Sequence, residues 1–388
     1  MIFLKVEDNY SNLFCFKIEL QKSSKSSTLL RDTIYYKPLQ QYVLIMKSQL
    51  TFLFVVLFTG SVFAQLTLKK VMESELYQTP PFKQCHASTL VQLSDGTFLA
   101  AAFGGTQEGN TDVSIWLSRY EKGKWQAPEK VATGASADGK VYPNWNPVLY
   151  KITPETLTLF YKTGPSPREW WGMYKVSTDE GKTWGPAQRL PDGILGPIKN
   201  KPITLVNGTL LAPSSTETRT TDGLSWKAHI EKSVDGGKHW EKIPIDPNTP
   251  YDVIQPSILV HTQDTLQILC RSRNDALMQA FSYDGGNTWS AITKTRLPNP
   301  NSGTDALTLS NGKHLLVYNP LINGKNDRSK LHIAYSEDGI VWEDVYVLES
   351  HKRGEYSYPA IIQDSENKIH VTYTYERKNI KHLTFNIL

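Results

Sequence analysis

Apolar runs alternate with short polar turns along most of the chain. Six times an apolar run is followed by a polar turn and a second apolar run, and these turns lie at 94–96, 153–155, 206–208, 262–264, 310–312 and 365–367. Three of the turns carry Asp-Gly or Asn-Gly, which is a strong hairpin signal between apolar runs. The hairpins recur about every 50–60 residues, and a period of this size is typical of repeat proteins.

A second motif, Ser-x-Asp-x-Gly-x-x-Trp, recurs between the hairpins. Full copies begin at Ser177, Ser233 and Ser282, a copy one residue shorter begins at Ser336, and a worn copy begins at Ser118. In such a turn the Asp accepts backbone hydrogen bonds, the Gly adopts a positive φ, and the Trp packs back on the hairpin. We therefore interpret this Asp box as a folding device at a strand turn, and not as a functional site.

Together the hairpins and boxes predict an all-β fold, a six-bladed β-propeller with four strands in each blade. Five boxes and six hairpins agree if the last blade is closed by the two ends of the chain. Strand-like residues at 66–76 would then lie beside those at 370–375 and 381–388. The propeller would occupy 65–388 and leave no segment for a second domain. Functional residues are expected near the start of each blade and on the connections.

The N-terminal part has a different pattern. After Met46-Lys47 an apolar run covers 50–63 and ends in Val62-Phe63-Ala64, which is typical of a secretory signal peptide at 46–64. The run is short for a transmembrane helix, although an uncleaved anchor is the alternative. We expect translation to begin at Met46, so that 1–45 is a spurious extension. The mature protein is then expected to be periplasmic or secreted, with no membrane span.

Composition narrows the class of ligand. The net charge is only +4, and no long basic run is present, so nucleic-acid binding is not indicated. Three cysteines cannot form a disulfide framework, and no metal-ligand or phosphate-loop motif occurs. We expect no cofactor, and a monomer that binds a glycan or oligosaccharide.

Polar and aromatic residues cluster repeatedly opposite the boxes, as in sugar sites. These segments are 142–147, 165–171, 199–202, 214–217 and 299–305. Within them we select Glu217 as a candidate catalytic residue, and Arg168 and Asp305 as candidate substrate-binding residues.

Asp boxes on a six-bladed propeller resemble the sialidase (neuraminidase) superfamily, specifically the BNR-repeat sialidase-like proteins, over about 70–388. The resemblance implies a retaining glycosidase with a tyrosine nucleophile. It also implies a glutamate that activates the tyrosine, an aspartate as acid/base, and three arginines that bind the substrate carboxylate.

Several positions match this pattern. Tyr356 lies in a Tyr-Ser segment at the start of the last blade, which is the place of the family nucleophile. Arg328 matches the third arginine and Arg271 the second, and Arg273 shares a strand face with Arg271 by the period of two. Arginine suits a carboxylate because it can donate two parallel hydrogen bonds.

Other positions depart from the pattern. His86 stands where the family has its first arginine, and Gln255 stands where it has the activating glutamate. An amide cannot act as a base, so Gln255 is expected to contact substrate. Glu108 or Asp112 could replace the acid/base aspartate. A histidine titrates near neutrality and can act as general acid or base, so His86 is a further catalytic candidate.

Three functions remain open at this point. The leading hypothesis is an exported exo-glycosidase that cleaves a terminal, acidic sugar. The second is chemistry centred on His86, either a polysaccharide lyase or a hydrolase that removes a neutral sugar from a uronate. The third is a glycan-binding propeller without catalysis.

Overall fold

The computed structural model describes residues 66–388, apart from 137–138, 222 and 323–326. The predicted extension at 1–45 and signal peptide at 46–64 lie outside the described residues. Residues 65–388 form one compact unit. Within the described part of this unit, all regular structure is β-strand, and no helix is long and apolar enough to cross a membrane.

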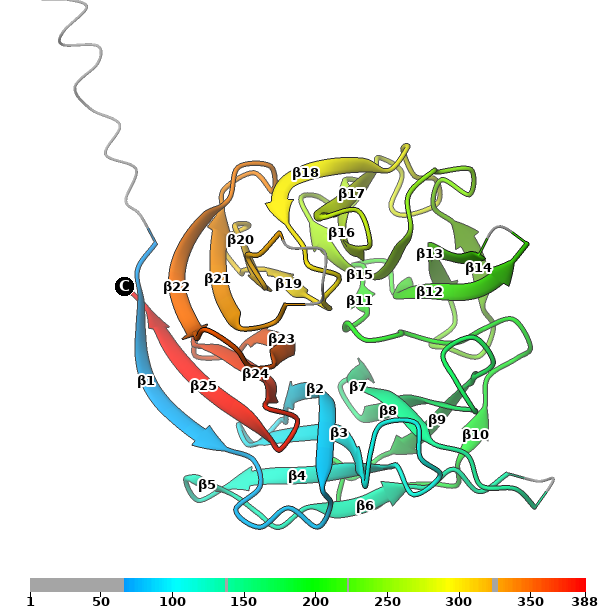
Figure 1. Ribbon diagram of the computed structural model, residues 1–388, viewed down its shortest axis with the longest axis vertical. Helices are drawn as coiled ribbons and strands as arrows, with labels where there is room; N and C mark the ends of the chain where they lie inside the picture. The colour runs from blue at the N-terminus through cyan, green and yellow to red at the C-terminus, as the bar shows by residue number, and fades with distance from the viewer. Residues whose placement is uncertain (1–65, 137–138, 222, 323–326) are drawn as a thin grey trace, which may run out of the picture. The chain divides into compact units, whose positions relative to one another are not determined.

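Six antiparallel sheets surround a common centre, which confirms the predicted six-bladed propeller (Figure 1). Blade 1 contains β2 (Gln84–Gln92), β3 (Phe98–Gly105), β4 (Ser114–Glu121), β5 (Lys124–Trp125) and β6 (Glu129–Ala132). Blade 2 contains β7 (Asn144–Thr153), β8 (Thr156–Thr163), β9 (Trp171–Ser177) and β10 (Gln188–Arg189). Blade 3 contains β11 (Ile203–Thr204), β12 (Leu210–Thr220), β13 (Gly223–Ser233) and β14 (Glu241–Pro244).

The remaining three blades follow the same order from the centre outward. Blade 4 contains β15 (Val253–Val260), β16 (Leu266–Ser272), β17 (Ala276–Ser282) and β18 (Thr293–Pro298). Blade 5 contains β19 (Asp305–Thr308), β20 (His314–Tyr318), β21 (Lys330–Ser336) and β22 (Glu343–Ser350). Blade 6 contains β23 (Tyr356–Gln363), β24 (Ile369–Tyr375), β25 (Asn379–Ile387) and β1 (Leu68–Glu75).

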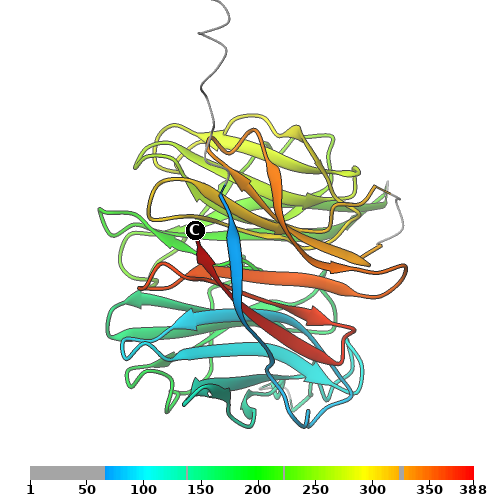
Figure 2. The ribbon, with the colours of Figure 1, turned by 90° about the vertical axis from the view of Figure 1, so that its left-hand side faces the viewer.

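The ring is closed by the two ends of the propeller. Strand β1 pairs antiparallel with β25, from Leu68 opposite Ile387 to Glu75 opposite Lys381. Figure 2 shows these two strands side by side. The predicted closure is thus correct, and it covers the edge that an open last blade would expose.

The Asp boxes form local turns, as predicted. In the box that follows β17, the Ser282 hydroxyl accepts a hydrogen bond from the Gly286 N–H at 2.8 Å, and Asp284 accepts one from the Thr288 N–H at 2.9 Å. Gly286 has a φ of +86°, and the Trp289 indole N–H donates a hydrogen bond to the Gly286 carbonyl at 3.3 Å. These bonds stay within the turn, so the box shapes the blade and contributes nothing to the centre of the ring.

Four inner strands carry a β-bulge near the start of the strand. The pairing register shifts after His86 in β2, after Trp145 in β7, after Ile254 in β15 and after Ser357 in β23. Each bulge contains a non-glycine residue with a positive φ, namely Ala87, Asn146, Gln255 and Tyr358. A bulge changes the direction of a side chain relative to regular alternation, and two of these four residues meet at the centre of the site.

Candidate active site

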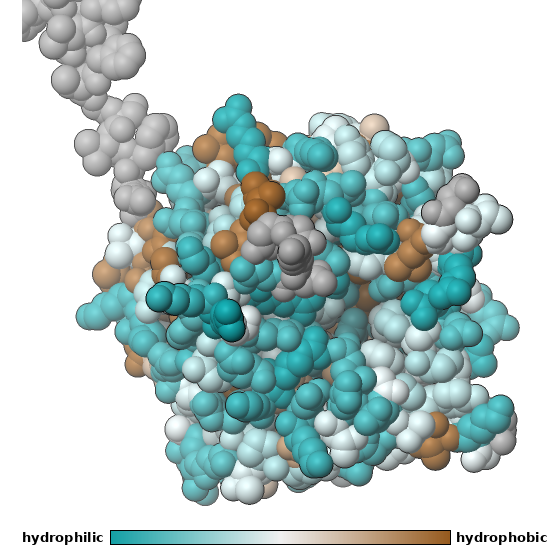
Figure 3. Space-filling model, in the orientation of Figure 1, coloured by the Kyte–Doolittle hydropathy of each residue, from teal (hydrophilic) through white to brown (hydrophobic). Residues whose placement is uncertain are grey.

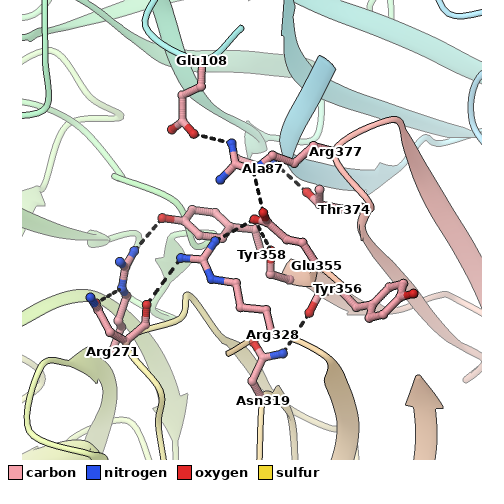
Figure 4. A network of polar contacts seen from close by, with 12 residues as sticks. Ala87, Glu108, Arg271, Asn319, Arg328, Glu355, Tyr356, Tyr358, Thr374 and Arg377 are labelled. Carbon is pink, nitrogen blue, oxygen red and sulfur yellow. Dashed lines mark hydrogen bonds and ion pairs between the residues drawn. The ribbon is translucent and has the colours of Figure 1, made fainter. Parts of the chain in front are cut away.

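Tyr358 lies among three arginines that come from different blades (Figure 4). The Arg271 Nη1 donates a hydrogen bond to the Tyr358 hydroxyl at 2.5 Å. The guanidinium carbons of Arg271 and Arg328 lie 5.7 and 5.3 Å from the centre of the Tyr358 ring. A phenol oxygen at this place is surrounded by positive charge, which would stabilise negative charge that develops on it.

Tyr356 does not lie in this cluster, which corrects the sequence-based choice of tyrosine. Its ring packs against His351 and Tyr375, with ring centres 4.6 and 5.2 Å apart. It belongs to the apolar core that blades 5 and 6 share, and Figure 4 shows it pointing away from the arginines. In a regular strand, 356 and 358 would share a face, but the bulge at Tyr358 breaks this alternation.

A sequence signal for Tyr358 does exist. Tyr358-Pro359 and Gln255-Pro256 stand at the same place in blades 6 and 4, at the bulge of the inner strand. Alignment of these two dipeptides places Tyr358, and not Tyr356, at the position in blade 6 that Gln255 has in blade 4.

Gln255 is a direct neighbour of Tyr358. Its Nε2 donates to the Tyr358 hydroxyl at 3.4 Å, and its Oε1 accepts from the Arg271 Nη1 at 3.3 Å. Because both amide ends are already used, Gln255 fixes the orientation of Tyr358 and Arg271. It cannot accept the phenol proton, since an amide is not basic at neutral pH.

Arg271 is buried and has no ionic partner among the residues that the structure describes. Its Nε donates to Asn301 Oδ1 at 2.9 Å, and its guanidinium lies over the Trp226 ring at 5.2 Å. Burial, reinforced by the neighbouring positive charge of Arg328, lowers the pKa of Arg271. A buried guanidinium that forms no direct ion pair is a ready partner for an anion.

Glu355 connects two other arginines. Its Oε1 lies 2.8 Å from Arg328 Nη1, and its Oε2 lies 2.8 Å from Arg377 Nε. Burial opposes ionisation of this carboxyl, but the hydrogen bond from Arg377 and the charge of Arg328 lower its pKa. Arg377 also forms an ion pair with Glu108 of the β3–β4 loop. Sequence reasoning missed Arg377 because it lies in the β24–β25 turn, outside any family motif.

His86 lies on β2 and is 2% exposed. Its ring centre is 4.1 Å from that of Tyr358, and its Nδ1 has no hydrogen-bond partner within the described chain. Burial lowers the pKa of His86 well below its usual value, and the nearby charges of Arg377 and Arg328 add to this effect. The imidazole is therefore neutral near pH 7.

Three predicted residues have other contacts. Asp112 accepts hydrogen bonds from the Thr106 N–H and hydroxyl at 2.8 and 2.9 Å, so it stabilises its own loop. Arg273 lies over the Trp226 ring and forms an ion pair with Asp252 at 3.5 Å. Asp305 is buried between blades, where it accepts from Lys201 Nζ and the Ile361 N–H at 2.8 and 2.9 Å. None of the three is brought to the Tyr358 hydroxyl.

Glu217 and Arg168 line a cavity of about 240 Å³ between blades 2 and 3, together with Trp170 and Trp171. Glu217 accepts a hydrogen bond from the Trp226 indole at 3.1 Å, and burial raises the pKa of its carboxyl. Trp226 also contacts Arg271, so its ring connects Glu217 to the arginine cluster. Aromatic rings beside polar groups are what a sugar ring requires.

Lys199 lies beneath Tyr358 and was not predicted as a site residue. Its Nζ is 5.9 Å from the centre of the Tyr358 ring. It donates to Asn200 Oδ1 at 2.8 Å, to the Thr304 carbonyl at 3.0 Å and to the Pro359 carbonyl. These contacts join blades 5 and 6 to the connection before blade 3, so Lys199 holds the backbone of Tyr358 in place.

The face of the propeller seen in Figure 3 is mostly hydrophilic, and its apolar side chains lie in small separate groups. A broad apolar patch would favour a protein partner, whereas a polar face around a charged cluster suits a hydrated ligand such as a glycan.

Comparison with known proteins agrees with the fold. Residues 96–371 match the family model for the BNR repeat-like domain, and the chain belongs to this family. It is similar to a sialidase of Bacteroides fragilis (strain YCH46), with 25% identity over 231 residues. That match covers 54% of this chain but only 40% of the sialidase.

Two solved structures show the same fold. A protein of unknown function from Dyadobacter fermentans matches with a TM-score of 0.69 and 17% identity, over 83% of this chain and 99% of that protein. A Hadza microbial sialidase matches with a TM-score of 0.66 and 18% identity, over 81% of this chain and 68% of the sialidase. The protein is therefore a sialidase-like BNR-repeat propeller.

Proposed function

We propose that this protein is an exported exo-glycosidase that hydrolyses a terminal, acidic sugar from a glycan. One observation carries the proposal, namely the Tyr358 hydroxyl held by Arg271 at the centre of the arginine cluster. The sialidases to which the chain is similar support the class of reaction.

The substrate carboxylate binds to the Arg271 guanidinium, which has no ionic partner among the described residues and faces Tyr358. A carboxylate that accepts two hydrogen bonds from a guanidinium is fixed in orientation as well as bound. The sugar is thereby placed with its anomeric carbon near the Tyr358 oxygen. The cavity beside Trp170 and Glu217 accommodates the next part of the glycan.

In the first step, the Tyr358 oxygen forms a bond to the anomeric carbon while the glycosidic carbon–oxygen bond breaks. Glu108 gives a proton to the departing oxygen, and neutral His86 takes the phenol proton that Gln255 cannot accept. In the second step, water attacks the anomeric carbon and gives a proton to Glu108. The carbon–Tyr358 bond breaks, and His86 returns its proton to the phenol, so the enzyme is regenerated.

The pair of tyrosines in β23 provides a matched test. Tyr358→Phe removes the proposed nucleophile, so kcat should fall at least about 1,000-fold. Tyr356→Phe changes a ring in the apolar core and should keep kcat within about threefold of wild type. Hydrolysis of a panel of sialosides and uronate glycosides measures both. Equal turnover by Tyr358→Phe and wild type would contradict the mechanism, and no product from any variant would favour a binding protein.

A second candidate function is a polysaccharide lyase, and the amide at Gln255 favours it. A lyase needs the uronate carboxylate neutralised, which Arg271 and Gln255 can do. A base then removes the proton beside that carboxylate, a carbon–carbon double bond forms, and the glycosidic bond breaks as its oxygen gains a proton. Tyr358 and His86 would share these two proton transfers. The product absorbs in the ultraviolet, so absorbance of the reaction distinguishes the two functions.

Export is part of the proposal and rests on the sequence at 46–64 alone. If a signal peptide is removed after Ala64, N-terminal sequencing of the protein recovered outside the cytoplasm should begin at Gln65. Recovery with residues 46–64 attached would support a membrane anchor instead.

A further inference from the structure

The cluster around Tyr358 contains three guanidinium groups although residue 86 is a histidine. Two of them, Arg271 and Arg328, come from the predicted positions. The third is Arg377 (Figure 4), which lies near the C-terminus, at the other end of the propeller sequence from residue 86. The backbone contact between Cys85 and Arg377 joins the two ends, because the Cys85 N–H donates to the Arg377 carbonyl at 2.8 Å. Arg377 is thus fixed next to the strand position that His86 occupies.

The turn that presents Arg377 is conformationally costly. The Lys378 N–H donates to the Tyr375 carbonyl at 3.0 Å, which leaves Glu376 and Arg377 as the two central residues of a tight turn. Both have a φ of +53°. Asn and Gly are the usual residues in such a turn, and other residues with a positive φ are conformationally strained. Strain of this kind persists where the surroundings require a particular side chain, and here the side chain is the Arg377 guanidinium.

Two carboxylates hold Arg377, and they differ in how firmly they are placed. Glu355 is bound through both oxygens to Arg328 and Arg377. Glu108 comes from the exposed β3–β4 loop, its side chain is 36% exposed, and Arg377 is the one residue of the described chain with which it forms an ion pair. An incoming carboxylate can therefore displace Glu108 more easily than Glu355. Displacement would leave Arg377 neutralised by the ligand and Glu108 unpaired at the mouth of the site.

We propose that Arg377 binds the carboxylate of the acidic sugar in place of the arginine that is missing at position 86, and that Glu108 occupies Arg377 while the site is empty. The inference rests on the proposed function in that the ligand is an acidic sugar. Replacement of Glu108 by the substrate carboxylate at Arg377 also links binding to catalysis. Glu108 is released from Arg377 by the substrate carboxylate, takes up a proton from water, and then gives that proton to the departing oxygen.

Calorimetric binding of a sugar acid and its methyl ester tests the inference without requiring turnover. The probes are N-acetylneuraminic acid and D-glucuronic acid, each compared with its methyl ester, which lacks the charge. Wild-type protein should bind at least one acid more tightly than the ester. Arg377→Met should weaken binding of that acid about 10–100-fold, as expected for a lost charge-assisted hydrogen bond, and leave the ester unchanged.

Loss of the Glu108 carboxylate should change the affinity for the acid in the opposite direction. Glu108→Gln should tighten binding of the acid several-fold, because the competing carboxylate is gone, even though the proposed acid of the reaction is lost. Lys378→Ala is the matched control, since it removes a positive charge from the same turn on an exposed side chain and should change neither affinity. Arg377→Gly relieves the positive φ at this residue, so its melting temperature shows whether a loss of binding comes from misfolding.

Three results would overturn the inference. The first is that wild-type protein binds neither acid more tightly than its ester. The second is that a folded Arg377→Met variant keeps wild-type affinity for the acid. The third is that Arg377→Met loses affinity equally for the acid and the ester. Absence of hydrolysis with retained preference for the acid would remove the proposed glycosidase activity and leave the role of Arg377 in place.

Discussion

Tyr358 owes its place to one backbone feature and three side chains. The bulge in β23 directs its ring into the cluster, Lys199 holds the carbonyl of Pro359, and Arg271 and Gln255 fix the hydroxyl. If Tyr358 is the nucleophile that we propose, its orientation before substrate arrives keeps the loss of entropy on reaction small. Its unusual neighbour is His86, whose ring contacts it at 4.1 Å. A neutral imidazole here removes one positive charge from the site and supplies one base.

The neutral state of His86 has a measurable consequence for stability. In the unfolded chain a histidine has a pKa of about 6.5, whereas burial lowers the pKa of folded His86 well below that value. Below pH ~6.5 the unfolded chain binds a proton that the folded protein does not, so stability present above this pH is lost as the pH falls.

We therefore expect the free energy of unfolding to lose up to about 1.4 kcal/mol per pH unit below pH ~6.5 through this residue. His86→Gln should remove that part of the slope. Urea denaturation at pH 7.5, 6.0 and 5.0 checks it, and buried His382, whose pKa is also lowered by burial, contributes equally to both proteins. Parallel pH profiles for wild type and His86→Gln would contradict the assignment.

At the scale of elements, the Asp boxes and the inner-strand bulges have different roles. The boxes close the outer turns with bonds inside the turn, and the bulges direct side chains at the centre. Asp284→Ala removes the acceptor of the Thr288 and Asn287 N–H groups. We expect its melting temperature to fall by about 2–6 °C, with no change in affinity for a sugar acid. A loss of affinity at unchanged melting temperature would place the box in the site after all.

This difference between the boxes and the bulges explains which features the sequence could predict. The turns and boxes are local signals, so the blades, their number and their closure follow from them. Arg271, Arg328, His86 and Gln255 were found because they stand in local motifs. Tyr356 was selected instead of Tyr358 because apolar alternation does not reveal the bulge, which only the Tyr358-Pro359 dipeptide indicates. Arg377 and Lys199 reach the centre through contacts between parts of the chain that are distant in sequence, and the polar segment at 199–202 does not by itself indicate these contacts.

At the scale of the whole molecule, the site depends on the closed ring. Glu355, Tyr358 and Arg377 all come from blade 6, and β1 supplies the outer strand of that blade. Leu66 and Leu68 are buried in the core that blades 5 and 6 share. The three site residues are therefore held by a blade that needs both ends of the propeller.

Removal of β1 should therefore weaken ligand binding, although β1 contributes no residue to the site. A chain that begins at Leu76 should unfold at a lower temperature than one that begins at Gln65, and any folded fraction should bind the sugar acid more weakly. Differential scanning calorimetry and the binding assay measure both quantities. Identical melting temperatures for the two chains would show that β1 is dispensable for closure.

The most direct test of the central claim is to trap the bond between Tyr358 and the sugar. Incubation with 2,3-difluorosialic acid, which is present as a covalent intermediate in a solved structure of Trypanosoma rangeli sialidase, is followed by proteolysis and mass spectrometry. We predict a sugar adduct on Tyr358 in wild-type protein and in Tyr356→Phe, and none in Tyr358→Phe. An adduct on another residue, or turnover of sialosides by wild-type protein without any adduct on Tyr358, would contradict the account.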